Sequence, residues 1–248
     1  MTIETGDDVV ALKRIGKIVS SVLHDMLDAA EPGMTTRELD SLGEQLLERH
    51  GARSAPKLTY NFHGSTCISI NEEAAHGIPG DRVIFAGDVL NVDVSAELGG
   101  YFADTGGTRV VPPTNAQKTR LCHAIRTALE QAMKGARAGQ PISGIGAAIE
   151  RTAKTYDVKV IENLGSHGVG RALHEAPEHI PGYVDPTDKR MLKAGMVITI
   201  EPFLSTKSRV VTEASDGWTL VGVRGNLSAQ YEHTMIITKG APIVVTQH

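Results

Sequence analysis

Four acidic residues of this 248-residue chain lie in segments that read as β-strands: Asp93, Asp104, Glu201 and Glu232. A carboxylate within an apolar strand is costly to bury alone, so it must be paired, hydrogen-bonded or bound to a cation. Four such groups gathered together would repel one another, and two divalent ions would neutralise their four negative charges. The pattern therefore indicates a dinuclear cation site, and such a site can activate a water molecule.

Histidine supplies the other candidate groups. His167 lies between small residues, in Ser-His-Gly-Val-Gly, where backbone and ligand can approach closely. His174 follows seven residues later, and His76 precedes Gly-Ile-Pro. Each feature taken alone has a simpler explanation, because a single strand aspartate is usually hydrogen-bonded and most of the ten histidines should be structural or on the surface. The functional interpretation therefore depends on the order and co-occurrence of these motifs in one chain.

The hydrophobic pattern predicts the elements that would position these groups. Apolar residues at spacings of three and four predict helices over about 8–30 and 36–50, and Thr35 with Glu38 has the spacing of a capping box. Alternating segments predict strands over 66–70 and 89–95, with Gly99-Gly100 as a turn into a partner strand over 101–105. Asp93 and Asp104 are symmetric about position 98.5, so we expect them to face each other on one side of this hairpin.

After Pro112-Pro113 the order of elements repeats. Two further helices are predicted over about 115–136 and 143–156, and strands over most of 158–248. The segment from Ala86 to Asp93 aligns with the segment from Ala194 to Glu201, which places a carboxylate at the same point in each. We therefore expect one catalytic domain over 1–248 with pseudo-repeats at about 8–111 and 115–248. A symmetric metal pair would lie on the pseudo-twofold axis between these ααβ halves.

Composition excludes several other classes of protein. The formal net charge of −4 gives no overall attraction to nucleic acid. The acidic start lacks the basic and apolar regions of a secretory signal, and no apolar run reaches the roughly 18 residues of a membrane span. Cys67 and Cys122 form no disulfide framework or spaced metal motif. A reducing cytoplasm is the expected location.

The ordered motifs resemble those of the type I methionine aminopeptidases over essentially the whole chain. They are Cys-Ile-Ser-Ile-Asn, His76-Gly-Ile-Pro, Asn-Val-Asp93-Val, Asp104-Thr-Gly, Ser-His167-Gly-Val-Gly, Thr-Ile-Glu201-Pro and Ser-Ala-Gln-Tyr-Glu232-His-Thr. The resemblance implies the α/β pita-bread fold, with two ααβ halves around a central antiparallel sheet. It also implies removal of the initiator methionine from nascent proteins with small second residues.

The same resemblance assigns roles to individual residues. Asp93 would bind the first metal ion, Asp104 and Glu232 would bridge two ions, and His167 and Glu201 would bind the second. Glu201 would also be the general base, while His76 and His174 would contact substrate and take part in catalysis. The pocket for the methionine side chain would be formed by Phe62, Cys67, Leu173 and Trp218, although the match around Thr59–His63 is loose and Leu173 replaces what is often an aromatic residue.

This ligand set suits Co²⁺, Mn²⁺, Fe²⁺ or Zn²⁺, and ligand type does not choose among them. The implied partner is a peptide or nascent-protein N-terminus, with transient ribosome association left open, and we expect a monomer with no membrane or specific nucleic-acid partner. The alternative is an X-Pro-specific peptidase of the same fold, which would use the same five ligands. A protein that kept the fold but lost the metals is disfavoured, because all five ligands are present.

Overall fold

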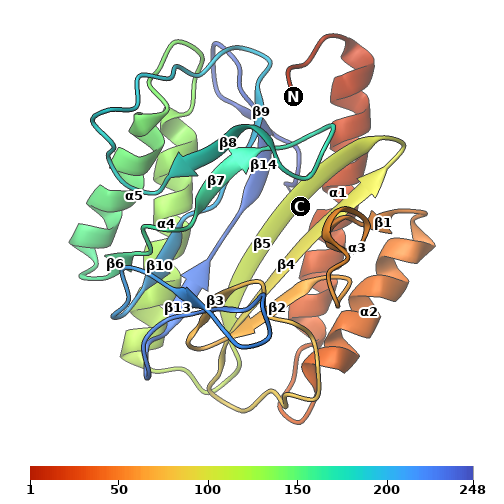
Figure 1. Cartoon of the computed structure of the whole chain (residues 1–248), viewed down its shortest axis with the longest axis vertical. Helices are drawn as coiled ribbons and strands as arrows, with labels where there is room; N and C mark the ends of the chain where they lie inside the picture. Colours follow the sequence, from red (N-terminus) through yellow and green to blue (C-terminus); the bar gives the residue numbers. More distant parts are fainter. Residues whose placement is uncertain (248) are drawn as a thin grey trace.

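The structure is a computed structural model that describes residues 1–247. Its five helices flank the strands, with α1 and α2 on one side of the molecule and α4 and α5 on the other (Figure 1). The helices are α1 (Gly6–Ala29), α2 (Thr36–Arg49), α3 (Ala55–Tyr60), α4 (Ala116–Gly135) and α5 (Ser143–Thr155). The four long helices expected from the sequence are confirmed to within two residues at each end. The short helix α3 was not predicted.

Local sequence explains where the first two helices begin. Thr35 and Glu38 form the predicted capping box, in which each side chain accepts a hydrogen bond from the other residue's backbone N–H. Thr5 and Asp8 form a second one at the start of α1. The apolar stripe of α1 is fully buried and packs on the sheet that contains Asp93.

The strands form four antiparallel sheets within the described residues. One sheet contains β1 (Arg53–Ser54), β2 (Cys67–Ile70), β4 (Val89–Leu98) and β5 (Tyr101–Val110). A five-stranded sheet contains β7 (Gly165–Gly168), β8 (Glu175–Pro181), β9 (Val197–Ile200), β14 (His233–Ile236) and β15 (Ile243–Val244). The two smaller sheets contain β6 (Lys159–Val160), β10 (Phe203–Ser205) and β13 (Ser228–Gln230), and β3 (Glu73–Ala75), β11 (Thr212–Glu213) and β12 (Leu220–Val221).

Hydrogen bonds join the two larger sheets at the centre of the molecule, where β5 lies beside β14 (Figure 1). The hydroxyl of Thr105 donates to the carbonyl oxygen of Glu232 at 2.8 Å. The backbone N–H of Asp104 donates to the hydroxyl of Thr234 at 2.9 Å. Side chains from both halves of the chain can therefore meet along this joint.

The hairpin between β4 and β5 has a register that differs from the predicted one. Gly99 and Gly100 both have positive φ, 62° and 83°, as a two-residue type I′ turn requires. Leu98 therefore pairs with Tyr101, and Asp104 pairs with Ser95, while Asp93 pairs with Gly106. The expected direct pairing of Asp93 with Asp104 is wrong, since the observed partner of each residue lies two positions from the expected one. The two carboxylates are diagonal neighbours and still lie on one face of the sheet.

The same backbone hydrogen bonds occur in both halves of the chain. Gly33 donates to the carbonyl of Ile84 at 2.9 Å, and Gly139 donates to that of Leu192 at 2.8 Å. Gly87 donates to Val111 at 2.7 Å, and Gly195 donates to Ile237 at 2.8 Å. Each half also has its own buried apolar cluster beneath its two long helices. These matches support the proposal that one domain consists of two pseudo-repeats.

Within the described residues, no helix combines the length and apolar character that a membrane crossing requires.

Candidate active site

The five predicted ligand residues come from both halves and converge at the joint between the sheets. Asp93 and Asp104 lie on β4 and β5, and their carboxyl groups contact each other. His167 lies on β7. Glu201 directly follows β9, and Glu232 directly precedes β14. One ligand atom from each of Asp104, His167 and Glu232 lies within 4.8 Å of the others. The structure therefore brings together the residues that the sequence singled out.

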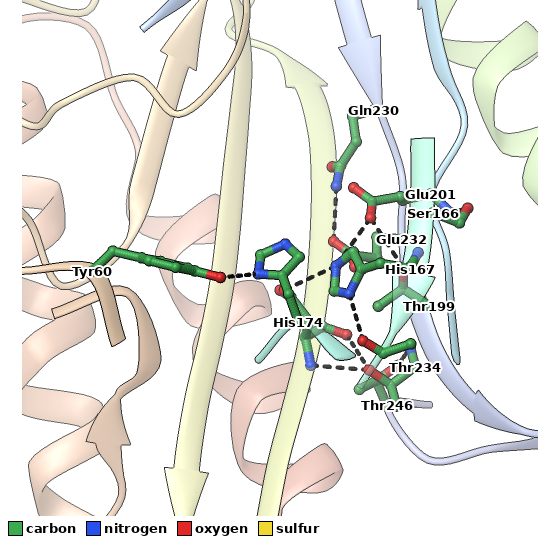
Figure 2. A network of polar contacts seen from close by, with 12 residues as sticks. Tyr60, Ser166, His167, His174, Thr199, Glu201, Gln230, Glu232, Thr234 and Thr246 are labelled. Atoms are coloured by element: carbon green, nitrogen blue, oxygen red, sulfur yellow. Dashed lines mark hydrogen bonds and ion pairs between the residues drawn. The ribbon is translucent and has the colours of Figure 1, made fainter. Parts of the chain in front are cut away.

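His167 is held so that one ring nitrogen points into the carboxylate cluster (Figure 2). Its Nδ1 lies 2.9 Å from the carbonyl oxygen of Gly168, which can only accept, so Nδ1 carries the proton. Its Nε2 lies 3.3 Å from Oε1 of Glu201 and 3.9 Å from Oδ2 of Asp104. Burial, with a smaller effect of His174, lowers the pKa of His167 to about 3. The ring is therefore neutral and offers an unprotonated nitrogen to a cation.

The carboxyl groups are buried among one another. Burial raises the pKa of Asp93 to about 6. Burial and then the charge of Asp93 raise the pKa of Glu201 well above its ordinary range. The same holds for Asp104 and Glu232, where burial is the largest cause and neighbouring carboxylates add to it. The charged forms of these groups are thus unfavourable until a positive charge is added.

Hydrogen bonds hold one oxygen of two of these carboxylates in place. The hydroxyl of Thr199 donates to Oε1 of Glu201 at 3.0 Å, and the amide of Gln230 donates to Oε2 of Glu232 at 2.9 Å (Figure 2). Oδ1 of Asp104 and Oε1 of Glu232, by contrast, are buried with no hydrogen-bond partner in residues 1–247. Two orphaned acceptor oxygens beside an unprotonated imidazole fit divalent metal ions, which take oxygen and imidazole ligands.

A cavity of about 380 Å³ opens on the cluster. Its lining includes ten of the eleven residues predicted from the sequence: Phe62, Cys67, His76, Asp93, Asp104, His167, Leu173, His174, Glu201 and Trp218. Glu232 is 1% exposed and lies behind this surface. One wall is apolar, since Phe62 and Trp218 contact edge to face with ring centroids 5.1 Å apart and Leu173 is buried. The cavity thus joins an acidic cluster to an apolar slot.

The two other predicted histidines also reach this cavity. His174 lies against His167, with ring centroids 4.0 Å apart. His76 directly follows β3 and has a positive φ of 56°, a strained conformation for a non-glycine residue. Burial lowers the pKa of both rings, so each is neutral near pH 7. A neutral imidazole can donate one hydrogen bond to a substrate.

The cavity lining also includes residues that the sequence reasoning missed, among them Pro56, Tyr60, His179 and Phe203. Tyr60 ends α3, in the stretch where the match to the family was loose. Ser54 caps that helix by accepting from the N–H of Lys57, and Pro56 stands near its start. A serine N-cap followed by an early proline is a readable signal for a helix start, and it could have predicted α3.

Comparisons with known proteins agree with this geometry. Residues 10–239 match the model of metallopeptidase family M24. A methionine aminopeptidase of Staphylococcus epidermidis is 48% identical over 248 residues, which cover 100% of this chain and 99% of that relative. The crystal structure of methionine aminopeptidase from Thermotoga maritima has a TM-score of 0.95 and 32% identity, with 100% of both chains covered.

A prolidase from Pyrococcus furiosus shares the fold, with a TM-score of 0.79 and 23% identity, and the match covers 100% of this chain and 66% of that protein. At that identity the likeness concerns the fold alone. The mixed α/β architecture expected from the sequence is confirmed by these neighbours.

Proposed function

The chain belongs to metallopeptidase family M24, and we propose that the buried cluster at its sheet joint is the active site of a methionine aminopeptidase. One observation carries the proposal. Asp104 and Glu232 each keep a buried oxygen without a partner beside the unprotonated nitrogen of His167, where Asp104 lines a cavity with an apolar wall and Glu232 lies directly behind that lining. A cation site next to an apolar slot suits hydrolysis of a peptide that begins with a large apolar side chain.

The metal ligands in this proposal are Asp93, Asp104, His167, Glu201 and Glu232. We propose two divalent ions, because four carboxylates carry four negative charges, and the donor set suits Mn²⁺, Fe²⁺, Co²⁺ or Zn²⁺. Bound divalent ions would lower the pKa of a water molecule and draw electron density from the scissile carbonyl group.

The chain's own residues would bind and orient the substrate. The flexible methionine side chain would lie against Phe62, Cys67, Leu173 and Trp218, where a thioether packs well. Bound cations would hold a free α-amine, whose nitrogen has an available lone pair, in preference to a blocked one. His76 would hold the scissile amide, and a cramped exit would favour small second residues.

Glu201 and His174 would carry the proton and charge changes of the reaction. Glu201 would take a proton from the attacking water and pass it to the leaving amine, because its carboxyl group lines the cavity and lies 3.3 Å from Nε2 of His167 at the proposed cation site. His174 would donate a hydrogen bond to the carbonyl oxygen as that oxygen becomes negative.

An X-Pro-specific peptidase would use the same five ligands, and the likeness to prolidase supports only the shared fold. The 48% identity to a methionine aminopeptidase over the full chain favours the methionine reading. The substrate is then a peptide N-terminus. A cytoplasmic location, a monomeric state and transient ribosome association stay proposals.

The test is release of free methionine from Met-Ala-Ser by chelator-stripped protein to which Mn²⁺ or Co²⁺ is returned. N-acetyl-Met-Ala-Ser and Ala-Pro are the controls. We expect metal-dependent cleavage of the unblocked methionyl peptide alone. Cleavage of Ala-Pro in its place would move the protein to the X-Pro-specific group, and equal cleavage of the blocked peptide would contradict the role of the free amine.

A further inference from the structure

Tyr60 makes a hydrogen bond to His174 across the cavity. Its hydroxyl oxygen lies 2.7 Å from Nδ1 of the imidazole, and the two rings are tilted by 52° with centroids 5.6 Å apart (Figure 2). In the described part of the chain, this is the one hydrogen bond formed by either side chain. The two residues are 114 positions apart in the sequence, so the contact depends on how the halves meet.

The chemistry of the two groups sets the direction of this hydrogen bond. A tyrosine hydroxyl is protonated near pH 7 and carries one proton to donate. A neutral imidazole carries one N–H, so a ring that accepts at Nδ1 has its proton at Nε2. The opposite arrangement would leave the proton of the exposed tyrosine hydroxyl to solvent and would leave Nε2 of His174 unprotonated. Donation from Tyr60 is therefore favoured.

The anchoring of α3 makes Tyr60 a fixed partner. The hydroxyl of Ser54 donates to the carbonyl oxygen of Ser65 at 2.8 Å, and Lys57 forms an ion pair with Glu44 of α2. Asn61 then ends the helix in the left-handed conformation, with a φ of 54°. His174, by contrast, lies outside regular structure, between β7 and β8. The contacts that hold α3 therefore fix the position from which Tyr60 reaches a segment without regular structure.

We propose that Tyr60 is a positioning residue that keeps His174 in the tautomer with its proton on Nε2 and holds the ring over the cavity. This inference rests on the proposed function, in which His174 donates to the developing oxyanion. A donor that is already protonated and oriented needs no rearrangement as the reaction proceeds. Tyr60 acts through His174 and does not itself touch the reacting atoms.

The kinetic test uses Tyr60→Phe, which keeps the ring and removes one hydroxyl, on Met-Ala-Ser with metal returned. We expect kcat to fall about 10- to 100-fold, with KM changed less than about threefold, as for loss of a residue that orients a functional group. In a His174→Ala background the same change should have an effect of less than about twofold, because the pair acts as a unit. The control is Tyr156→Phe, since Tyr156 touches the ring of His123 outside the cavity.

The second test is a ¹⁵N–¹H correlation spectrum of the imidazole groups in the chelator-stripped protein, in which His174 is assigned from a His174→Gln difference spectrum. We expect the His174 proton on Nε2 in the natural chain and a mixture of tautomers in Tyr60→Phe. This measurement does not depend on activity.

The two tests distinguish a failure of the proposed function from a failure of the proposed role of Tyr60. If the natural chain fails to cleave Met-Ala-Ser, the proposed function fails, and the spectrum still decides the hydrogen bond. If the natural chain is active, an unchanged kcat in Tyr60→Phe overturns the role of Tyr60. An equal loss in the His174→Ala background overturns it too, because the hydroxyl would then act directly on substrate, and so does a His174 proton found on Nδ1.

Discussion

Nε2 of His167 and Oε1 of Glu201 face each other at 3.3 Å, and each can act as an acceptor. The Nδ1 proton of His167 is taken by the carbonyl of Gly168, so no ring proton lies between them. Two acceptors at this distance need a proton or a cation between them. Burial raises the pKa of Glu201, so this carboxyl group carries the proton in metal-free protein. We expect metal ions to replace that proton.

Metal-free protein should lose stability as the pH rises through about 6. The pKa of Asp93 rises from 3.8 to about 6 on folding, so its favourable contribution is present below about pH 4 and lost as pH rises through about 6. Asp104, Glu201 and Glu232 extend the loss to higher pH. Thermal denaturation should show that the Tm gap between metal-loaded and stripped protein widens from about pH 5.5 to about pH 8. A gap that stays constant over this range would contradict the clustering of these carboxyl groups.

Asp104→Asn should raise stability and abolish metal binding together. Oδ1 of Asp104 has no partner and the residue is 6% exposed, so the neutral amide removes a carboxyl group that must either carry a buried charge or hold a proton above its ordinary pKa in the stripped protein. A gain of about 1 kcal/mol corresponds to a rise of roughly 2–4 °C in Tm for a domain of this size. Added Mn²⁺ should produce no further rise. Asp81→Asn, at an exposed ion pair with Arg37, is the control, and a Tm of stripped Asp104→Asn below that of the natural chain would refute this account.

Glu201→Gln should remove the base and one ligand charge while keeping the side-chain shape. The hydroxyl of Thr199 can still donate to the oxygen that replaces Oε1. We expect kcat/KM for Met-Ala-Ser to fall by about 10³-fold or more. Glu162→Gln, at an exposed ion pair with Arg209, should leave kcat/KM unchanged. Activity of Glu201→Gln within about tenfold of the natural chain would rule out its role as base.

Gly106→Ala should weaken the hold on the carboxylate of Glu232 through Gln230, while the hydrogen bond from the Glu232 backbone N–H to the carbonyl oxygen of Gly106, at 2.9 Å, is kept. A Cβ at Gly106 would lie 2.2 Å from Oε1 and 2.5 Å from Nε2 of Gln230, whose amide donates to Glu232. The amide must therefore move, and we expect metal affinity to fall about 10- to 100-fold. Competition between the stripped variant and a fluorescent chelator measures this.

Gly144→Ala is the matched control for that substitution. A Cβ at Gly144 meets nothing within 4 Å, and this position lies in α5, where alanine favours the helix by about 1 kcal/mol. If Gly106→Ala binds the metal ion as tightly as Gly144→Ala does, Gln230 does not support Glu232.

The sequence predicted the four long helices because their apolar stripes and the capping box at Thr35 and Glu38 are local signals. It also predicted which side chains meet, since carboxylates in strand-like contexts need a common cation. It misplaced the pairing of Asp93 and Asp104, because the two-residue turn at Gly99-Gly100 moves the hairpin centre by one residue. The contact of Tyr60 with His174 could not be predicted from local sequence patterns, because it depends on how α3 packs against a loop 114 positions away.

The placement of the ligands on both halves has a consequence for synthesis of the chain. Asp93 and Asp104 are made well before Glu232, which lies 128 positions after Asp104 (232 − 104). At about 5–20 residues per second, the ribosome needs roughly 6–26 s to cover that interval. The early hairpin carries two of the proposed ligands, while His167 follows 63 positions after Asp104 (167 − 104) and Glu201 follows 97 positions after it (201 − 104). A growing chain can assemble the full proposed ligand set only after Glu232 has been made, so metal capture by all five residues must follow synthesis of both halves.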